Sequence, residues 1–345
     1  MKRKVYQIGP SLELKGGIST VIYNLSNSED LNLNYDLINI KSVGKYKLIT
    51  FIKSIFRSIN IENDSIVHFH VASNGSFIRK YILFKLINKH SKKIIHIHGG
   101  GFIEFYQKTN NIMKSYIRDM INNCDKIISV SNYMTEELNR EFPSIDTKIS
   151  MIYNGIEIKN ITINWEDKKN VILFMGRIVE YKGIYNLIDV IKNIKYNLKK
   201  EKWIVKIAGD GEVEKVKDII KEKNLEDLIQ VVGWVDGEKK ENIIKESKIF
   251  IMPSHVESFG IAAVEAMNYG NVIVCSDVGG LPEIVKSENG YVVKNNSIEE
   301  YCKVLNHLIK NNNEMREISQ RNIKKSEEFS LEKMFSNLIK EYENL

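Results

Sequence analysis

The sequence predicts an α/β protein made of two doubly wound domains. Short apolar stretches alternate with amphipathic helical stretches along nearly the whole chain, which is typical of parallel βαβ units. The alternation pauses once, at residues 157–170, where the chain is polar and has poor periodicity. In addition, 345 residues exceed what one hydrophobic core usually holds.

The expected strands form two sets of six. The first set comprises residues 5–8, 36–40, 65–71, 93–98, 126–130 and 148–152. The second set comprises residues 171–176, 203–209, 229–234, 249–254, 271–277 and 291–293. Helical periodicity fills the intervals, for example at 48–59 and 76–89.

These elements divide the chain into four parts. We expect an N-terminal Rossmann-like domain at 1–156, a linker at 157–170, a C-terminal Rossmann-like domain at 171–325, and a helix at 326–345 that crosses back to the first domain. Ligands of doubly wound folds bind at the carboxyl ends of the strands. A deep cleft between the two facing domains is therefore the expected site.

Composition narrows the class of protein. The apolar fraction of 43% and the charged fraction of 27% are ordinary globular values. Cys124, Cys275 and Cys302 are far apart and form no Cys-x-x-Cys pair, so a reducing cytosol is expected and a cysteine-bound metal is not. The first residues lack the apolar core of a signal peptide, and no apolar run approaches the ~18 residues that span a bilayer.

The net charge is +6, and the charged residues are unevenly distributed along the chain. Residues 1–160 contain 22 Lys and Arg against 14 Asp and Glu, whereas residues 161–345 contain 28 against 30. A basic first half suits nucleic acid, anionic lipid or a phosphorylated acceptor, or simply solubility. The stretch 46–59 carries an apolar stripe, for which we expect a packed core helix, with an interfacial helix as the alternative. The stripe comprises Leu48, Phe51, Ile52, Ile55, Phe56 and Ile59.

The most informative stretch is 253–285. Glu257 and Glu265 flank a loop that leads into an apolar helical run beginning near Gly260. A helix N-terminus offers unpaired backbone N–H groups and the positive end of its dipole, which suits a pyrophosphate. Carboxylates accept hydrogen bonds from the hydroxyls of sugars and riboses. The pattern favours a site for a nucleotide attached to a sugar over an ordinary helix with two solvated glutamates.

Two cations follow the first strand of the second domain. Arg177 and Lys182 lie between Gly176 and Gly183. A guanidinium and an ammonium at one strand exit can neutralise a diphosphate leaving group, although solvated surface charge is the simpler explanation for either alone. The segment 207–212, which contains Gly209 and Asp210, lacks the third glycine of a dinucleotide fingerprint and is expected to form a turn near the nucleotide base.

The first domain offers a glycine turn and a histidine. Gly16 and Gly17 open a helix, where a ligand can approach the backbone closely, although a plain turn would look the same. His98 ends an expected strand and precedes three glycines, so we expect it to orient a sugar or stabilise developing charge. The nearby His68, His70 and His96 are other candidates for this role. The alternative to a functional role is a histidine that is simply buried in the core.

Together these motifs resemble the retaining glycosyltransferases of family 4, which have the GT-B fold. The resemblance extends over nearly the whole chain and is most specific in GRIVEYKG, AGDGE, VVGWV, the Glu257–Glu265 block and GGLPEIV. The family's linker motif Pro-Asn-Gly is replaced here by Tyr153-Asn154-Gly155. By this resemblance the first domain would serve the acceptor side, and the second would bind the nucleotide sugar.

The resemblance also implies roles for individual residues. Arg177 and Lys182 would hold the donor pyrophosphate, bordered by Gly17. Glu257 would bind the sugar hydroxyls beside His98, and Glu265 the ribose hydroxyls. The remaining donor contacts would come from the amides of Phe259, Gly260 and Ile261, from Ser258, and from Gly209, Asp210 and Val235 near the base. His98, Glu257, Arg177 and Lys182 would be the catalytic residues.

The implied reaction transfers a sugar from a nucleoside diphosphate to an acceptor hydroxyl with retention of configuration. We expect no metal or other cofactor, a UDP-sugar rather than a GDP-sugar as co-substrate, and a glycan or lipid-linked acceptor of surface polysaccharide synthesis. The protein would be cytoplasmic and peripheral at the inner face of the plasma membrane, bound through its basic first domain. The alternatives are a nucleotide-sugar epimerase, a phosphorylase, or a non-catalytic subunit with the same fold. A missing GxGxxG disfavours a nicotinamide oxidoreductase, and no motif indicates nucleic-acid binding.

Overall fold

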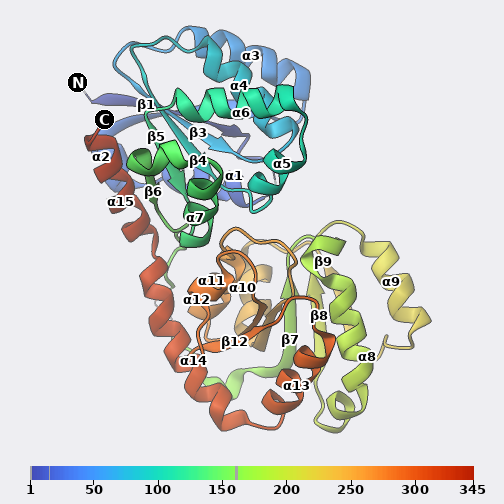
Figure 1. The fold of residues 1–345 in the computed structure, drawn as a ribbon. Helices are drawn as coiled ribbons and strands as arrows, with labels where there is room; N and C mark the ends of the chain where they lie inside the picture. Colours follow the sequence, from blue (N-terminus) through green and yellow to red (C-terminus); the bar gives the residue numbers. More distant parts are fainter. Residues whose placement is uncertain (1, 15, 160–161) are drawn as a thin grey trace. The chain divides into compact units, whose positions relative to one another are not determined.

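The computed structural model describes residues 2–14, 16–159 and 162–345 and contains two compact units. The N-terminal unit comprises Met1–Gly155 and Leu331–Leu345, and the C-terminal unit comprises Ile156–Ser330. Each unit has one six-stranded parallel sheet, and helices connect its strands (Figure 1). Each expected strand is confirmed with shifted ends.

The N-terminal sheet has the order β2-β1-β3-β4-β5-β6. Its strands are β1 (Arg3–Pro10), β2 (Tyr35–Val43), β3 (Ile66–Val71), β4 (Lys92–Ile97), β5 (Lys126–Ser129) and β6 (Ile149–Met151). Its helices are α1 (Gly17–Ser26), α2 (Glu29–Asn34), α3 (Lys47–Ile59), α4 (Gly75–Leu86), α5 (Phe102–Lys108), α6 (Asn111–Asn122), α7 (Asn132–Glu141), η1 (Pro143–Lys148) and α15 (Leu331–Glu343). The strand order reverses between β1 and β3, which makes their carboxyl ends the switch point of this unit.

The C-terminal sheet has the order β12-β11-β10-β7-β8-β9, with its switch point between β7 and β10. Its strands are β7 (Lys169–Met175), β8 (Ile204–Ala208), β9 (Ile229–Gly233), β10 (Ser247–Met252), β11 (Val272–Ser276) and β12 (Gly290–Val293). Its helices are η2 (Trp165–Asp167), η3 (Glu180–Lys182), α8 (Ile184–Lys200), α9 (Val213–Glu222), α10 (Gly237–Glu246), α11 (Ile261–Asn268), α12 (Leu281–Ile284), α13 (Ile298–Leu308), α14 (Asn312–Ser326) and η4 (Glu327–Phe329).

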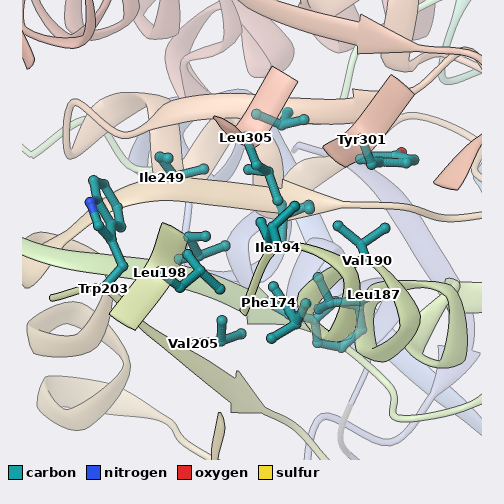
Figure 2. Packing of buried hydrophobic residues seen from close by; sticks show 14 of the residues in the cluster. Phe174, Leu187, Val190, Ile194, Leu198, Trp203, Val205, Ile249, Tyr301 and Leu305 are labelled. Carbon is teal, nitrogen blue, oxygen red and sulfur yellow. The ribbon is translucent and has the colours of Figure 1, made fainter. Parts of the chain in front are cut away.

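Helix–sheet packing forms the core of the C-terminal unit. One apolar face of α8 packs between the sheet and α13, and Leu187, Ile194 and Leu198 lie on that face (Figure 2). Burial of each such side chain contributes roughly 1.5–3 kcal/mol to folding. Packing in this core holds the strands and helices in place. Most of the site residues lie in the loops that connect the carboxyl ends of the strands to the amino ends of the next helices.

Two segments bear on the expected division of the chain. Within the stretch 157–170, residues 160 and 161 lie outside the described residues, but Trp165 is buried in the core of the C-terminal unit. The second half of this stretch therefore packs as part of that unit. The final helix α15 belongs to the N-terminal unit, where Met334, Leu338 and Tyr342 join its core.

The expectation that 46–59 is a core helix is wrong. The face of α3 toward the unit carries the buried Ser54 and Ser58, whose small side chains let the helix approach closely. The apolar stripe is largely exposed: Leu48 is 71% exposed and Phe56 is 65% exposed. Among the helices of the described residues, none is both long and apolar enough to cross a bilayer.

Candidate functional site

The switch point of the C-terminal unit joins two oppositely charged side chains. Lys182 ends η3, which follows β7, and Glu257 lies in the loop that follows β10. Lys182 Nζ is 2.5 Å from Glu257 Oε2, and both side chains are partly buried. Because β7 and β10 are neighbouring parallel strands, their carboxyl ends meet at one edge of the sheet. Sequence reasoning placed Lys182 at a strand exit and Glu257 in the loop before a helix, but it did not predict that they pair.

Two left-handed glycines fix the loops that carry this pair. Gly183, with φ of 73°, follows Lys182 directly, and a Cβ there would lie 1.8 Å from the carbonyl oxygen of Pro253. Gly279, with φ of 56°, packs against the backbone of Glu257, where a Cβ would lie 1.6 Å from its carbonyl oxygen. Only glycine combines a positive φ with such an approach. The backbone positions of Lys182 and Glu257 are therefore set by close contacts rather than by the pair itself.

The helix after Glu257 begins where the sequence predicts. Gly260 is the N-cap of α11 in the left-handed conformation, and Phe259 is buried behind it. The first intrahelical bonds are donated by the amides of Ala263 and Val264 to the Gly260 carbonyl. The amides that precede them, including that of Ile261, lie outside this ladder at the positive end of the helix dipole. Such a helix start can bind an anionic oxygen.

The second glutamate of the block also has a partner. Glu265, inside α11, pairs with Lys240 of α10 at 2.7 Å. Sequence reasoning missed Lys240, because it is one of many lysines in a polar helix and gives no motif. The carboxylate is 23% exposed, so it retains access to solvent and to a ligand hydroxyl.

Most of the other residues that the sequence predicts to contact the donor lie just beyond the ends of β7, β8 and β9. Arg177 is exposed, and among the described residues its side chain has no ion pair or hydrogen bond. Gly209 donates its amide to the Gly233 carbonyl at 2.8 Å, and the carbonyl of Asp210 accepts from the amide of Ile178 at 2.6 Å. These bonds align the three strand exits. Val235 is buried just beyond β9, and Ser258 follows Glu257 in the same loop.

In the N-terminal unit, Gly17 and His98 follow different strands. Gly17 is exposed at the start of α1, with open space around its Cβ position. His98 follows β4, held by a bond from its amide to the Val71 carbonyl at 3.0 Å. It is 8% exposed, whereas His68 and His70 are completely buried.

Two histidines of β3, one of β4 and His98 directly after β4 form one buried cluster. His70 Nδ1 lies 3.0 Å from His98 Nε2, and His68 Nε2 lies 3.1 Å from His96 Nδ1. Burial, and secondarily the charge of Lys80, lowers the pKa of His98 to about 3. Burial also lowers the pKa of His68 to about 3 and those of His70 and His96 well below the ordinary value. All four rings are therefore neutral at physiological pH.

Ligand atoms of His68, His70 and His96 lie within 4.8 Å of one another, which is a spacing that a metal ion could in principle use. The rings of His68 and His70 are stacked at 4.4 Å between centroids, as are those of His68 and His96 at 5.2 Å. Stacked rings direct their nitrogen lone pairs along parallel planes rather than toward one point. The geometry fits a hydrogen-bonded cluster better than a coordination shell.

Comparisons with known proteins agree with this architecture. The family model described as Glycosyltransferase Family 4 matches residues 37–160, and that described as Glycosyl transferases group 1 matches residues 156–326. An uncharacterised glycosyltransferase of Methanocaldococcus jannaschii is 30% identical over 89% of this chain and 84% of its own length. The capsular polysaccharide biosynthesis glycosyltransferase CapH of Staphylococcus aureus is 26% identical over 72% of this chain and 68% of its own length.

Solved structures show the same fold. A glycosyltransferase from Rickettsia africae has a TM-score of 0.76 at 17% identity, covering 99% of this chain and 98% of that one. Anabaena HepE in complex with UDP has a TM-score of 0.74 at 16% identity, covering 99% of this chain and all of that one. The chain therefore belongs to the glycosyltransferases of family 4 and group 1, and its two parallel six-stranded sheets have the GT-B fold.

Proposed function

We propose that this glycosyltransferase transfers a hexose or N-acetylhexosamine from a nucleoside diphosphate sugar, with retention of configuration, to a hydroxyl of a lipid-linked glycan acceptor in surface polysaccharide synthesis. The observation that carries the donor assignment is the Lys182–Glu257 pair at a sheet switch point, one loop away from the N-terminus of α11. A cation, a helix start and a carboxylate together match a diphosphate joined to a sugar.

The Lys182–Glu257 ion pair is the arrangement of the site before the donor binds. A bound diphosphate would attract Lys182 away from Glu257, together with the exposed Arg177. Glu257 would then be released to accept hydrogen bonds from sugar hydroxyls. The exchange replaces one ion pair by charge-assisted bonds to the donor, so little charge is left without a partner.

In the transfer step, the bond between the sugar C1 and the diphosphate oxygen breaks, and a bond from C1 to the acceptor oxygen forms on the same face. The acceptor proton passes to the departing phosphate oxygen, so atoms and charges balance without an enzyme nucleophile. Lys182, Arg177 and the amides at the start of α11 stabilise the charge that develops on the diphosphate. We propose that no metal is needed, since these groups already supply positive charge.

A UDP-sugar is the proposed donor. The crystal structures of Anabaena HepE hold UDP and UDP-glucose, and that of a pneumococcal O-GlcNAc transferase holds UDP and GlcNAc. The base would lie by Val235 and the turn at Gly209 and Asp210, and its ribose by Glu265.

A thermal-shift screen of UDP-, GDP- and ADP-sugars tests the donor site. A ligand at a hundred times its Kd should stabilise the parent by about 2.7 kcal/mol. Lys182→Met should lose this stabilisation and sugar transfer. Lys206→Met is the matched control, because Lys206 has similar side-chain exposure (18% against 21%) and pairs with Glu246 within β8 and α10. Equal ligand stabilisation in the parent and in Lys182→Met would contradict the site.

The proposed lipid-linked acceptor is supported by the outer face of α3 and α4, which pack side by side (Figure 1). We call this surface the α3–α4 face. Its exposed apolar side chains are Leu48, Ile49, Ile52, Phe56, Ile59, Ile78, Ile82 and Leu86. Exposed apolar side chains in such a row cost free energy in water and are stabilised at a lipid interface.

Charge around the α3–α4 face fits an anionic membrane. Residues 41–59 and 75–93 together contain eleven Lys and Arg and no Asp or Glu, and of these cations only Lys80 is buried. Each basic residue near an anionic surface contributes ~1 kcal/mol to binding. An enzyme held there through its N-terminal unit would meet an acceptor whose lipid anchors it in the same membrane.

Vesicle sedimentation tests this association. The parent should bind vesicles that contain phosphatidylglycerol and leave neutral phosphatidylcholine vesicles largely unbound, with binding reduced by salt. Leu48→Ser with Phe56→Ser should weaken binding without affecting folding, because both side chains are exposed. Tyr196→Ser, an equally exposed aromatic of the C-terminal unit, is the control. Binding that is unchanged by the double substitution would refute the proposed surface.

A further inference from the structure

A line of buried hydrogen bonds leads from β1 to His98. Gln7, in the middle of β1, is completely buried, and its Oε1 is hydrogen-bonded to His70 Nε2. On its other side, His70 Nδ1 is bonded to His98 Nε2. The amide of Gln7 is oriented from behind, since its Nε2 donates to the hydroxyl of Tyr342 on α15 at 3.2 Å.

Proton counting gives this line a direction. An amide oxygen can only accept, so the single proton of neutral His70 lies on Nε2. His70 Nδ1 is then a lone pair, and it must accept from His98 Nε2–H. The single proton of His98 is thereby used, and its Nδ1 is left as a lone pair. Across the described residues, His98 has no other ring hydrogen bond.

We infer that Gln7 and His70 are positioning residues that set the tautomer of His98, so that His98 Nδ1 accepts a hydrogen bond from a hydroxyl of the donor sugar. This role rests on the proposed function and on the expectation from the sequence that His98 orients the donor sugar. It explains why a lone amide is buried in an apolar strand, where an unpaired polar group would be costly. Two imidazole rings and three hydrogen bonds separate Gln7 from the sugar, so Gln7 acts without touching it.

The opposite tautomer would make His98 Nδ1 a donor. A sugar hydroxyl can both donate and accept, but it has only one proton to donate. With His98 accepting that proton, the hydroxyl oxygen is free to accept from another group. We call the hydrogen-bonded line from Gln7 through His70 to His98 the relay. It determines whether the sugar hydroxyl must donate to His98 or accept from it.

Nuclear magnetic resonance reads this directly. In full-length protein labelled with ¹⁵N-histidine at pH 7.5, we expect both His70 and His98 to carry the proton on Nε2. Gln7→Met removes the acceptor with little change in size, and His98 should then shift toward the Nδ1–H form. Gln7→Glu restores an acceptor and should restore the parent tautomers. An Nδ1–H signal from His98 in the parent would overturn the inference, whether or not the variants fold.

Kinetics supply the second readout. Gln7→Met should lower kcat for sugar transfer about two- to tenfold, the range that one neutral hydrogen bond contributes, with the donor KM little changed. Ser42→Ala removes another buried hydrogen bond next to β1, from Ser42 Oγ to the Gly9 carbonyl, and should leave kcat near the parent value. Equal kcat losses in the two variants would reduce Gln7 to a structural role and overturn the inference.

The two readouts separate this inference from the proposed function. If the tautomers follow the acceptor at position 7 but no nucleotide sugar supports transfer, the relay is present and the proposed reaction is wrong. If transfer occurs with His98 in the Nδ1–H form, the reaction stands and the relay is wrong.

Discussion

Acidification should destabilise the N-terminal unit through its histidine cluster. In the folded protein, burial lowers the pKa of His68 and of His98 to about 3, and it lowers the pKa values of His70 and His96 well below the ordinary value. In the unfolded chain all four take up protons near the ordinary pKa of about 6.5. The unfolded state therefore binds more protons below that pH, and stability falls as the pH is lowered.

The size of the effect follows from that difference. Between pH 7.5 and 6.0 each buried histidine that stays neutral lowers the free energy of unfolding by just under about 1 kcal/mol, so the four together lower it by about 3 kcal/mol. The loss continues toward pH 3, where His68 and His98 begin to protonate in the folded state. A loss of about 3 kcal/mol is a large share of the 5–15 kcal/mol that holds a typical domain folded.

Urea unfolding at the two pH values measures this loss. Far-UV circular dichroism monitors both units, whereas Trp165, Trp203 and Trp234 all belong to the C-terminal unit, so their fluorescence monitors that unit. In the double variant His68→Asn and His96→Asn the pH-dependent loss should be smaller than in the parent by about half of the 3 kcal/mol, and the contributions of other titrating groups, such as the buried Lys80 with its pKa of about 7, cancel in this difference. A loss below about 1 kcal/mol in the parent, or an equal loss in the variant, would refute the reasoning.

Five further substitutions, two of them comparison variants, test the C-terminal site and the hydrogen bonds of α15. Gly279→Ala should displace the loop of Glu257, lower the free energy of unfolding by about 1–3 kcal/mol and weaken donor binding. Gly237 also has a positive φ but open space around its Cβ position, so Gly237→Ala should lower the free energy of unfolding by only about 1 kcal/mol and leave donor binding intact. Equal losses in urea titrations of the two variants would contradict this. Glu265→Gln should weaken nucleotide binding in calorimetry, while Lys240→Met frees the carboxylate and should not; parallel weakening would assign the pair a structural role. Tyr342→Phe should lower the melting temperature by a few degrees, since a buried hydroxyl bonded to both Gln7 and His68 is lost, and an unchanged value in calorimetric scans would argue against these bonds.

The strands could be predicted because parallel strands covered on both faces are continuous apolar runs, as in VILFM at 171–175 and IFIM at 249–252. Each expected strand overlaps an observed one, and the GT-B fold follows from their order. The start of α11 was also predictable, because a glycine directly before an apolar helical run marks a helix start. Gly260 caps this helix with a positive φ, which glycine adopts readily.

Other features depend on tertiary contacts that local patterns do not contain. The apolar stripe of α3 indicates one apolar face, but it does not show whether other parts of the protein cover that face. The face of α3 that packs against the unit carries Ser54 and Ser58 instead. The partners of Glu257 and Glu265 come from segments 75 and 25 residues away, and neither separation has a periodic signal. For Gln7 a signal existed, namely one amide within an apolar strand, but its partner on α15 is 335 residues away.

The return of the chain at α15 has a consequence for biosynthesis. The first 155 residues leave the ribosome before residues 331–345 are made, and the 175 residues between them belong to the other unit. At ordinary elongation rates this interval lasts roughly 10–35 s, during which the part of the apolar core that receives Met334, Leu338 and Tyr342 lacks its covering helix. The part that is translated first is completed last, so nascent chains expose an apolar surface that chaperones can recognise until synthesis reaches α15.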